Sequence, residues 1–230
     1  MDTQPPTESE IQPKPRSRPA KKAEKKALNL NLPEKLFILS IDDDQGAIAA
    51  SIKATLRYGL AGALLAELAL DNKIILEDGR LALVASVPYR EAFYDKILEL
   101  IAAEEKPRKL SYWVETIGSK QIVKQVAERL AERNVITIKK QRYGWISPYE
   151  VYPQVDASAK YWVKQRLREI VLLNEVVAPS EIILFSLLRA CQFLKFVFTS
   201  DEHKSASKKV EAMAKGEVFG KSVAKILEKR

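Results

Sequence analysis

The chain has 230 residues, 47% hydrophobic and 30% charged, which is the composition of an ordinary globular protein large enough to bury a core. Its single cysteine and single histidine exclude an intramolecular disulfide and a structural zinc site built from those two ligand types. The net charge of +8 predicts an anionic partner, either a lipid surface or a nucleic acid.

The beginning of the chain differs from the rest in composition. It holds five of the eleven prolines and almost no large apolar side chains, and residues 13–27 (PKPRSRPAKKAEKKA) carry seven basic residues against one glutamate. Such a segment cannot bury enough apolar surface to offset the entropy of ordering. We therefore predict a disordered, Pro/Lys/Arg-rich tail over residues 1–29 and one folded domain over residues 30–230. Four lysines of the tail are candidates for electrostatic contact with an anionic membrane: Lys21, Lys22, Lys25 and Lys26.

The folded domain is predicted to begin with a helix at Asn31. Asn31 offers a capping side chain, Pro33 a first-turn proline and Glu34 a first-turn acid, a combination typical of helix starts. Apolar residues continue to Ile41, and the loop Asp42–Gly46 follows.

A long helix is predicted over Ala47–Leu70. Apolar residues return at helical intervals along it, and its second half (GLAGALLAELAL) is almost entirely apolar, which is typical of a central helix. The small residues around Gly59 and Gly62 allow another helix to approach closely, so this Gly-x-x-Gly pair indicates packing. Glu67 interrupts the apolar run. We expect it to be either a partnered carboxylate near the domain centre or part of a narrow exposed stripe.

Two short β-hairpins are predicted after this helix. The first covers Lys73–Val84, with Asp78-Gly79 at the turn. The second covers Val135–Ser147, because the sequence alternates there and turns near Arg142-Tyr143-Gly144. An irregular connection is expected between Pro148 and Pro153.

The remaining segments are predicted to be helical. A helix between Pro88 and Pro107 is expected to place four apolar residues on one face: Phe93, Ile97, Leu100 and Ile101. Further helices are expected over Arg108–Ile117, Lys120–Arg133 (closed by Asn134), Asp156–Leu173, Pro179–Phe198, Lys204–Lys215 and Glu217–Lys229. The predicted fold class is therefore mainly α, a single helical domain around a central helix, with short β-hairpins, preceded by a disordered basic tail.

Motifs for catalysis, cofactors and metals do not occur in a usable arrangement. The sequence contains no phosphate-binding glycine loop, dinucleotide fingerprint or HExxH segment. In the acidic loop Asp42–Asp44, setting Gly46 at position six of a calcium-binding loop places Ile41 and Ile52 where acids are required. We therefore expect a protein without catalytic residues, metal or cofactor.

Basic residues on the helix Lys120–Arg133 and on the hairpin after it permit two interpretations. The residues are Arg129, Arg133, Lys139, Lys140 and Arg142. In a winged-helix module, the helix would read a groove of a nucleic acid while the hairpin lies on the phosphate backbone. In a surface hairpin, the lysines would keep an edge strand soluble. Among the tryptophans, alternation places Trp145 toward the core, and helical spacing does the same for Trp113 and Trp162.

The order of the segments resembles the Golgi phosphoprotein 3 family over about residues 33–215. The family-like stretches are Leu36–Ile41 with the acidic loop, Gly59–Leu70, Trp113–Glu115, Leu130–Ile136 and the KQRL sequence at Lys164–Leu167. The resemblance implies a mainly α-helical fold around a central helix. It also implies recognition of phosphatidylinositol 4-phosphate on the cytosolic face of membranes, and an adaptor role toward protein cargo.

The headgroup pocket of this family uses one tryptophan and three arginines. By position these fall on Ile52, Ala61, Lys120 and Val123, of which only Lys120 keeps the chemistry. One lysine is a poor substitute for three guanidinium forks, and nearby basic residues can supply further charge-assisted donors. The candidate lipid-binding residues are therefore Lys53, Arg57, Lys120 and Lys124.

Two functions remain as hypotheses. The first is a cytoplasmic, non-catalytic peripheral membrane adaptor that binds phosphatidylinositol 4-phosphate or anionic lipid surfaces, on the cytosolic face of the Golgi if the source is eukaryotic. Each basic residue near an anionic surface contributes on the order of 1 kcal/mol, so the tail favours electrostatic and weakly selective binding. The alternative is a nucleic-acid-binding protein that uses the winged-helix-like segment and the basic tail.

Overall fold

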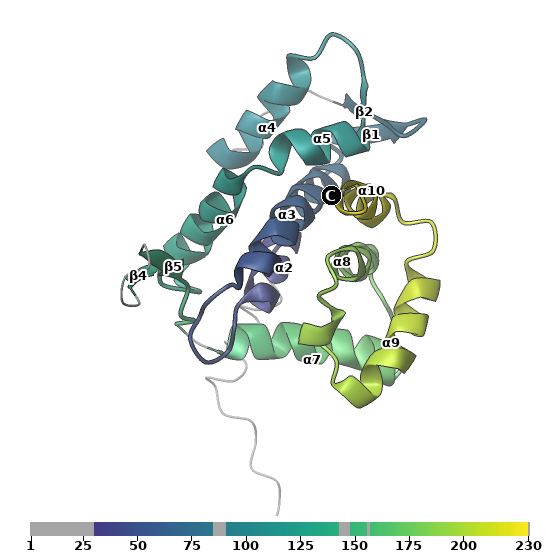
Figure 1. The fold of residues 1–230 in the computed structure, drawn as a ribbon. Helices are drawn as coiled ribbons and strands as arrows, with labels where there is room; N and C mark the ends of the chain where they lie inside the picture. Colours follow the sequence, from purple (N-terminus) through teal and green to yellow (C-terminus); the bar gives the residue numbers. More distant parts are fainter. Residues whose placement is uncertain (1–29, 85–90, 143–147, 156, 230) are drawn as a thin grey trace, which may run out of the picture.

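The structure is a computed structural model that describes residues 30–84, 91–142, 148–155 and 157–229, and it is mainly α-helical (Figure 1). The predicted tail over residues 1–29 lies outside the described residues. The helices are α2 (Leu32–Ser40), α3 (Ala50–Leu70), α4 (Ala92–Ala102), α5 (Leu110–Ile117), α6 (Lys120–Glu132), α7 (Ser158–Leu172), α8 (Pro179–Ala190), α9 (Ser200–Met213) and α10 (Val218–Leu227), with a 3-10 helix η1 (Leu194–Phe196). One antiparallel sheet contains β1 (Ile74–Glu77), β2 (Arg80–Leu83) and β3 (Arg108–Lys109), and a second contains β4 (Lys139–Gln141) and β5 (Tyr149–Val151).

Helix α3 is the centre of the fold, as its apolar periodicity predicts. It contacts α2, α5, α6, α8 and α10, which Figure 1 shows arranged around it. Four leucines that return at helical spacing on α3 are fully buried: Leu56, Leu60, Leu64 and Leu68. Truncating one of them to alanine costs about 2–5 kcal/mol, because the transfer free energy is lost and a cavity remains.

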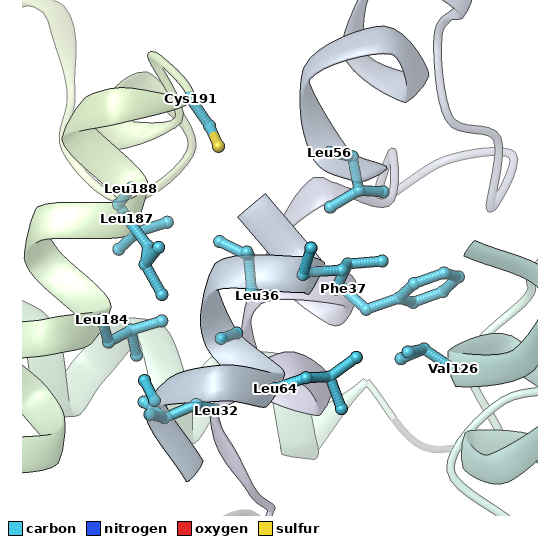
Figure 2. Close-up of a cluster of buried hydrophobic side chains, with 14 of the residues drawn as sticks. Leu32, Leu36, Phe37, Leu56, Leu64, Val126, Leu184, Leu187, Leu188 and Cys191 are labelled. Carbon is cyan, nitrogen blue, oxygen red and sulfur yellow. The ribbon is translucent and has the colours of Figure 1, made fainter. Parts of the chain in front are cut away.

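The core is formed where α2 meets α3, α6 and α8. Figure 2 shows Phe37 of α2 extending toward Val126 of α6, while Leu184 and Leu187 of α8 approach α2 from the other side. All four side chains are buried. Helix α2 therefore packs on α3 and contacts α6 on one side and α8 on the other.

Two glycines of α3 permit close packing, as predicted for the Gly-x-x-Gly pair. A Cβ on Gly59 would lie 2.6 Å from Cys191 Sγ, and one on Gly62 would lie 2.7 Å from a methyl group of Val223. Both distances are too short for real contacts, so the glycines are required by the helices that cover α3. Burial among these helices raises the pKa of the Cys191 thiol to about 12.

The beginning of α2 confirms the predicted cap and gives Glu67 a partner. Asn31 Oδ1 accepts the backbone N–H of Glu34 at 3.1 Å, and the Glu34 carboxylate accepts that of Asn31 at 3.0 Å, which forms a capping box. Glu67 of α3 accepts the backbone N–H of Leu32 at 3.0 Å. Burial raises the pKa of the half-buried Glu67 carboxyl. Glu67 is therefore the partnered carboxylate, at the positive end of α2.

The first predicted hairpin is confirmed and has a third strand. Asp78 and Gly79 form its turn with φ of 49° and 71°. Arg108 and Lys109 were predicted to start a helix, but they pair with β2 as β3, and α5 begins only at Leu110. A two-residue strand carries no periodicity that a sequence pattern could reveal.

The second predicted hairpin has its return strand in the wrong place. Strand β4 pairs with Tyr149–Val151, which lies beyond Ser147 and inside the segment predicted to be irregular. Pro148 precedes this strand and Pro153 follows it, so neither removes a hydrogen bond from the ladder. The predicted turn at Tyr143-Gly144 and the tryptophan Trp145 lie outside the described residues.

Helix α8 ends at Ala190, whereas the prediction extended it to Phe198. Gln192 adopts a left-handed φ of 60°, and the N–H of Phe193 bonds to the carbonyl of Leu188 at 2.7 Å, which closes the helix. Glutamine is not a usual residue for this position, so the sequence gives no stop signal. The predicted closure of α6 by Asn134 is confirmed, with φ of 55°.

The buried face of α4 is rotated about the helix axis relative to the predicted face. Tyr94, Ile97, Leu98 and Ile101 are buried at the spacing i, i+3, i+4 and i+7. Leu100 falls on the flank of this stripe and is 46% exposed. Other boundaries shift by a few residues, and α9 begins at Ser200 instead of Lys204.

Candidate functional site

The four predicted lipid-binding residues lie on two helices that contact each other, α3 and α6. Lys53 and Arg57 are one turn apart on α3, where both are half-buried, and Lys120 and Lys124 are one turn apart on α6, where both are exposed. Residues four apart share a helix face, so each helix presents its two cations on one side. Lys124 also pairs with Glu128 at 3.5 Å. We call these four residues the α3–α6 basic surface.

The Arg57 side chain lies near the beginning of α6 because it contacts its neighbour Tyr58. Arg57 Nη2 donates to the Tyr58 hydroxyl at 2.6 Å, and the guanidinium carbon lies 4.4 Å from the centre of the ring. The ring packs on Gly118, where a Cβ would lie 2.5 Å from Tyr58 Cδ1. Gly118 and Ser119 directly precede α6. The arrangement therefore places a guanidinium group near the positive end of a helix.

The Nε of Arg57 is the most informative atom of this surface. It is buried, and it has no hydrogen-bond partner among the described residues. A buried donor without an acceptor is costly, and an anion would remove that cost once the guanidinium group turns to expose this atom. The first turn of α6 contains no acidic residue that would compete for such an anion.

The positions that correspond by resemblance to the family pocket do not form a polar site. Ala61 is fully buried and Val123 is 8% exposed, so both belong to the core. Ile52 is partly buried and packs against the same core. Of the four positions only Lys120 places a cation at the surface.

Two arginines that the winged-helix hypothesis assigned to nucleic-acid binding form ion pairs within the protein. Arg129 Nε donates to Glu34 Oε1 at 3.0 Å, and Arg133 donates to Glu34 Oε2. Arg129 makes two further bonds to Glu91, one of them at 3.1 Å. The Glu34 side chain is 0% exposed, so these arginines neutralise a buried carboxylate. They do not form a free cationic stripe for a nucleic acid.

The cations of the second hairpin remain at the surface. Lys139, Lys140 and Arg142 are exposed, and Lys140 stands opposite Glu150 across the β4–β5 ladder. Of the tryptophans expected in the core, Trp113 is 2% exposed and Trp162 is partly buried against the core. The tail lysines Lys21, Lys22, Lys25 and Lys26 lie outside the described residues.

The acidic loop is fixed by partners from the protein itself. Asp42 accepts the backbone N–H groups of Asp44 and Gln45 at 3.0 Å each. Asp43 pairs with Lys160 and, at 3.8 Å, with Lys164 of α7. The hydrogen bond from Lys160 is one cause of the lowered pKa of the Asp43 carboxyl, although burial opposes it. The loop thus connects α2 to the KQRL helix.

Two features of the basic surfaces were not predicted from the sequence. Tyr58 holds Arg57 against the α5–α6 junction, and the only signal for this contact is the Gly118-Ser119 pair before a basic helix. The pairing of β3 with β2, which gathers Arg80, Arg108 and Lys109, had no signal at all.

The chain matches a protein-family model over most of its length. A model described as Golgi phosphoprotein 3 (GPP34) matches residues 32–230, most of the chain. The match begins at the first residue of α2 and includes every helix and strand named above. Among the described residues, no helix combines the length and the apolar character needed to cross a membrane.

Proposed function

The chain belongs to the Golgi phosphoprotein 3 family, and on this basis we propose that it is a non-catalytic peripheral membrane adaptor that binds anionic lipid surfaces. The match of the family model over residues 32–230 is the observation that carries the proposal. An adaptor also needs a protein partner, so we propose a protein cargo beside the lipid, with both bound at the cytosolic face of a membrane.

The proposed lipid contact is the α3–α6 basic surface. Arg57 is the residue best prepared to hold a phosphate, because Tyr58 fixes one end of its guanidinium group and its Nε lacks an acceptor. Lys120 stands in the first turn of α6, where the backbone N–H groups and the helix dipole favour an anion. Lys53 and Lys124 add charge one turn away on each helix.

The proposed binding is weakly selective among anionic lipids. Discrimination between phosphoinositides needs several bidentate and stacking contacts around one headgroup. The burial of Ala61 and Val123 supports the view that this chain lacks two of these contacts. The proposed main attraction is instead the charge of the tail, through Lys21, Lys22, Lys25 and Lys26.

Flotation of the full chain with vesicles of defined composition tests the proposal, beside a duplex-DNA mobility shift at matched salt. The chain is expected to float with anionic vesicles and not with neutral ones. Binding should decrease steeply with salt, because the Debye length falls from about 30 Å at 0.01 M to about 10 Å at 0.1 M. Failure to bind anionic vesicles at low salt would refute the membrane function. Tighter binding to duplex DNA than to vesicles would favour the nucleic-acid alternative.

A further inference from the structure

A second basic site lies along α5, between the three-stranded sheet and α10. A hollow of about 580 Å³ opens there, within the range of roughly 300–1,000 Å³ that is usual for ligand sites. Five of its lining residues are cations, and the acidic lining residue is Glu115. The five cations are Arg80, Arg108, Lys109, Lys225 and Lys229. We call this hollow the sheet–α10 cleft.

The β2–β3 pairing places two exposed cations opposite each other, although neither belongs to the core. Arg80 stands directly opposite Lys109 in the β2–β3 ladder, and like charges in that position destabilise a sheet. Arg80 also has Glu77 opposite it on β1, but its guanidinium donates to the carbonyl of Pro107 at 3.0 Å. Arg80 is therefore directed toward β3, on the side of the cleft, and held there.

Neutralising groups at the rim of the cleft do not balance its charge. Glu104 accepts from Arg108 Nε at 2.9 Å and from the Tyr112 hydroxyl at 2.7 Å, so both of its oxygens have partners. Even with Glu104 and Glu77 added to Glu115, five cations face three carboxylates. Two of the cations come from the C-terminal side of the cleft: Lys225 lies in the last turn of α10, which packs beside α5, and Lys229 lies two residues beyond its end.

Five cations around one hollow fit a multiply charged phosphate group better than a singly charged carboxylate. Two arginines offer planar forks that match phosphate oxygens, and three lysines add point charges around them. Ser111 and Tyr112 add hydroxyl groups to the lining. We propose that the sheet–α10 cleft is a second anion-binding site, which takes a multiply charged phosphate group from a soluble polyphosphate or from a phosphorylated lipid headgroup.

This site is separate from the α3–α6 basic surface. Helix α5 is about 12 Å long, at 1.5 Å per residue, with β3 at its beginning and Gly118 at its end. The cleft is lined by Ser111, Tyr112 and Glu115 of α5, whereas the Tyr58 ring that holds Arg57 packs on Gly118. The two sites share no residue, so each can be tested by its own variants.

Calorimetric titration of the full chain with tripolyphosphate and with inositol hexakisphosphate tests the cleft. The variant Lys109→Glu with Lys225→Glu changes two exposed lining residues, and Lys204→Glu with Lys208→Glu on α9 is a control of equal charge. Loss of two charge-assisted contacts is expected to weaken binding by roughly tenfold or more in the cleft variant only. If the first variant does not fold, Lys225→Glu with Lys229→Glu leaves the sheet intact and carries the same expectation.

Two further arms identify the source of the phosphate. Competition of tripolyphosphate with vesicles that contain phosphatidylinositol 4-phosphate, lost in the cleft variant, supports a headgroup. Soluble binding without such competition supports a soluble polyphosphate. Equal affinity of the cleft variant and the α9 control overturns the proposal. Loss of soluble binding in Arg57→Ala also overturns it, because the phosphate would then bind at the α3–α6 surface. Binding of duplex DNA at the cleft without any binding of tripolyphosphate overturns it in favour of a nucleic acid.

Discussion

Replacing Glu34 with glutamine tests whether the buried carboxylate at the start of α2 holds the helices around α3 together. Glutamine keeps the size of the side chain and its carbonyl can still accept the N–H of Asn31, so the capping box survives. The change removes the negative charge that Arg129 and Arg133 share. The effect on stability therefore isolates the ion pairs from the cap.

The expected magnitude follows from the burial of the three groups. Removing one partner of a buried ion pair costs about 3–5 kcal/mol, because the other charge is left unpaired. Here Glu34 is 0% exposed, but Arg129 and Arg133 are 21% and 34% exposed, and Arg129 keeps Glu91. We therefore expect a loss of about 2–3 kcal/mol, or roughly 4–12 °C in Tm for a chain of this size. Glu34→Ala also removes a capping bond and should cost roughly a further 0.5–1 kcal/mol.

Urea denaturation followed by circular dichroism measures these changes, with Glu128→Gln as the matched control. Glu128 forms an exposed pair with Lys124 on the same helix, so its loss should change stability by less than about 0.5 kcal/mol. Equal stability of Glu34→Gln and the wild type would show that the arginines find other partners or water. Arg129 and Arg133 would then not act as the internal countercharges of Glu34.

Three further predictions concern a helix start, a helix contact and a thiol. The bidentate Arg168 lowers the pKa of Glu202 from its usual 4.5 to about 2, so its contribution to stability is present above pH 4.5 and lost as the pH falls toward 2. The difference in Tm between wild type and Glu202→Gln should accordingly shrink over that interval, and a constant difference would contradict the pair. Gly220→Ala should lower the free energy of unfolding by about 1–3 kcal/mol, because a Cβ there would lie 2.0 Å from Ser186 Oγ and 2.7 Å from the backbone carbonyl carbon of Ser186. An unchanged urea midpoint would refute this close contact. Cys191 should resist a maleimide at pH 7 in the native protein and react at once in urea, because its side chain is buried and its thiol pKa is raised to about 12. Fast labelling of the native protein would show that the helices around α3 open.

The central part of the fold could be predicted from the sequence because it rests on periodic apolar residues. The long apolar helix became α3, and the cap at Asn31 was found because capping depends on neighbouring residues. Strand β5 and the end of α8 could not be predicted in the same way. The first depends on pairing with β4, and the second on a left-handed glutamine, and neither leaves a local pattern.

Charged residues were harder to interpret than apolar ones, because their partners come from distant parts of the chain. Arg129 and Arg133 belong to a basic run in the sequence, and their partner Glu34 lies about one hundred residues earlier. The same pattern recurs at two other helix starts. Glu181 and Glu202 each accept the N–H of the residue before the helix and bind an arginine of α7. A first-turn glutamate thus joins two helices in each case, which a single sequence does not reveal.

The candidate lipid surface was predicted only as a set of residues, and its geometry depends on contacts that the set did not include. Resemblance gave Lys120 and pointed to Arg57, but the position of Arg57 depends on Tyr58 and Gly118. The burial of Ala61 and Val123 follows from the tight packing of α3 and α6. At the positions that correspond by resemblance to the family pocket, the structure has the core side chains Ala61 and Val123, the partly buried Ile52 and the exposed Lys120.

Flotation on vesicles of equal net charge, with and without phosphatidylinositol 4-phosphate, tests directly whether the membrane attraction is electrostatic and weakly selective. Such an attraction predicts similar binding to both. It also predicts a large loss when Lys21, Lys22, Lys25 and Lys26 are neutralised, and small losses for Arg57→Ala and Lys120→Ala, because exposed charges act on any anionic bilayer within a Debye length of about 8 Å at physiological salt. A strong preference for the phosphoinositide that disappears in Arg57→Ala or Lys120→Ala would contradict it, since the α3–α6 basic surface would then be a selective headgroup pocket.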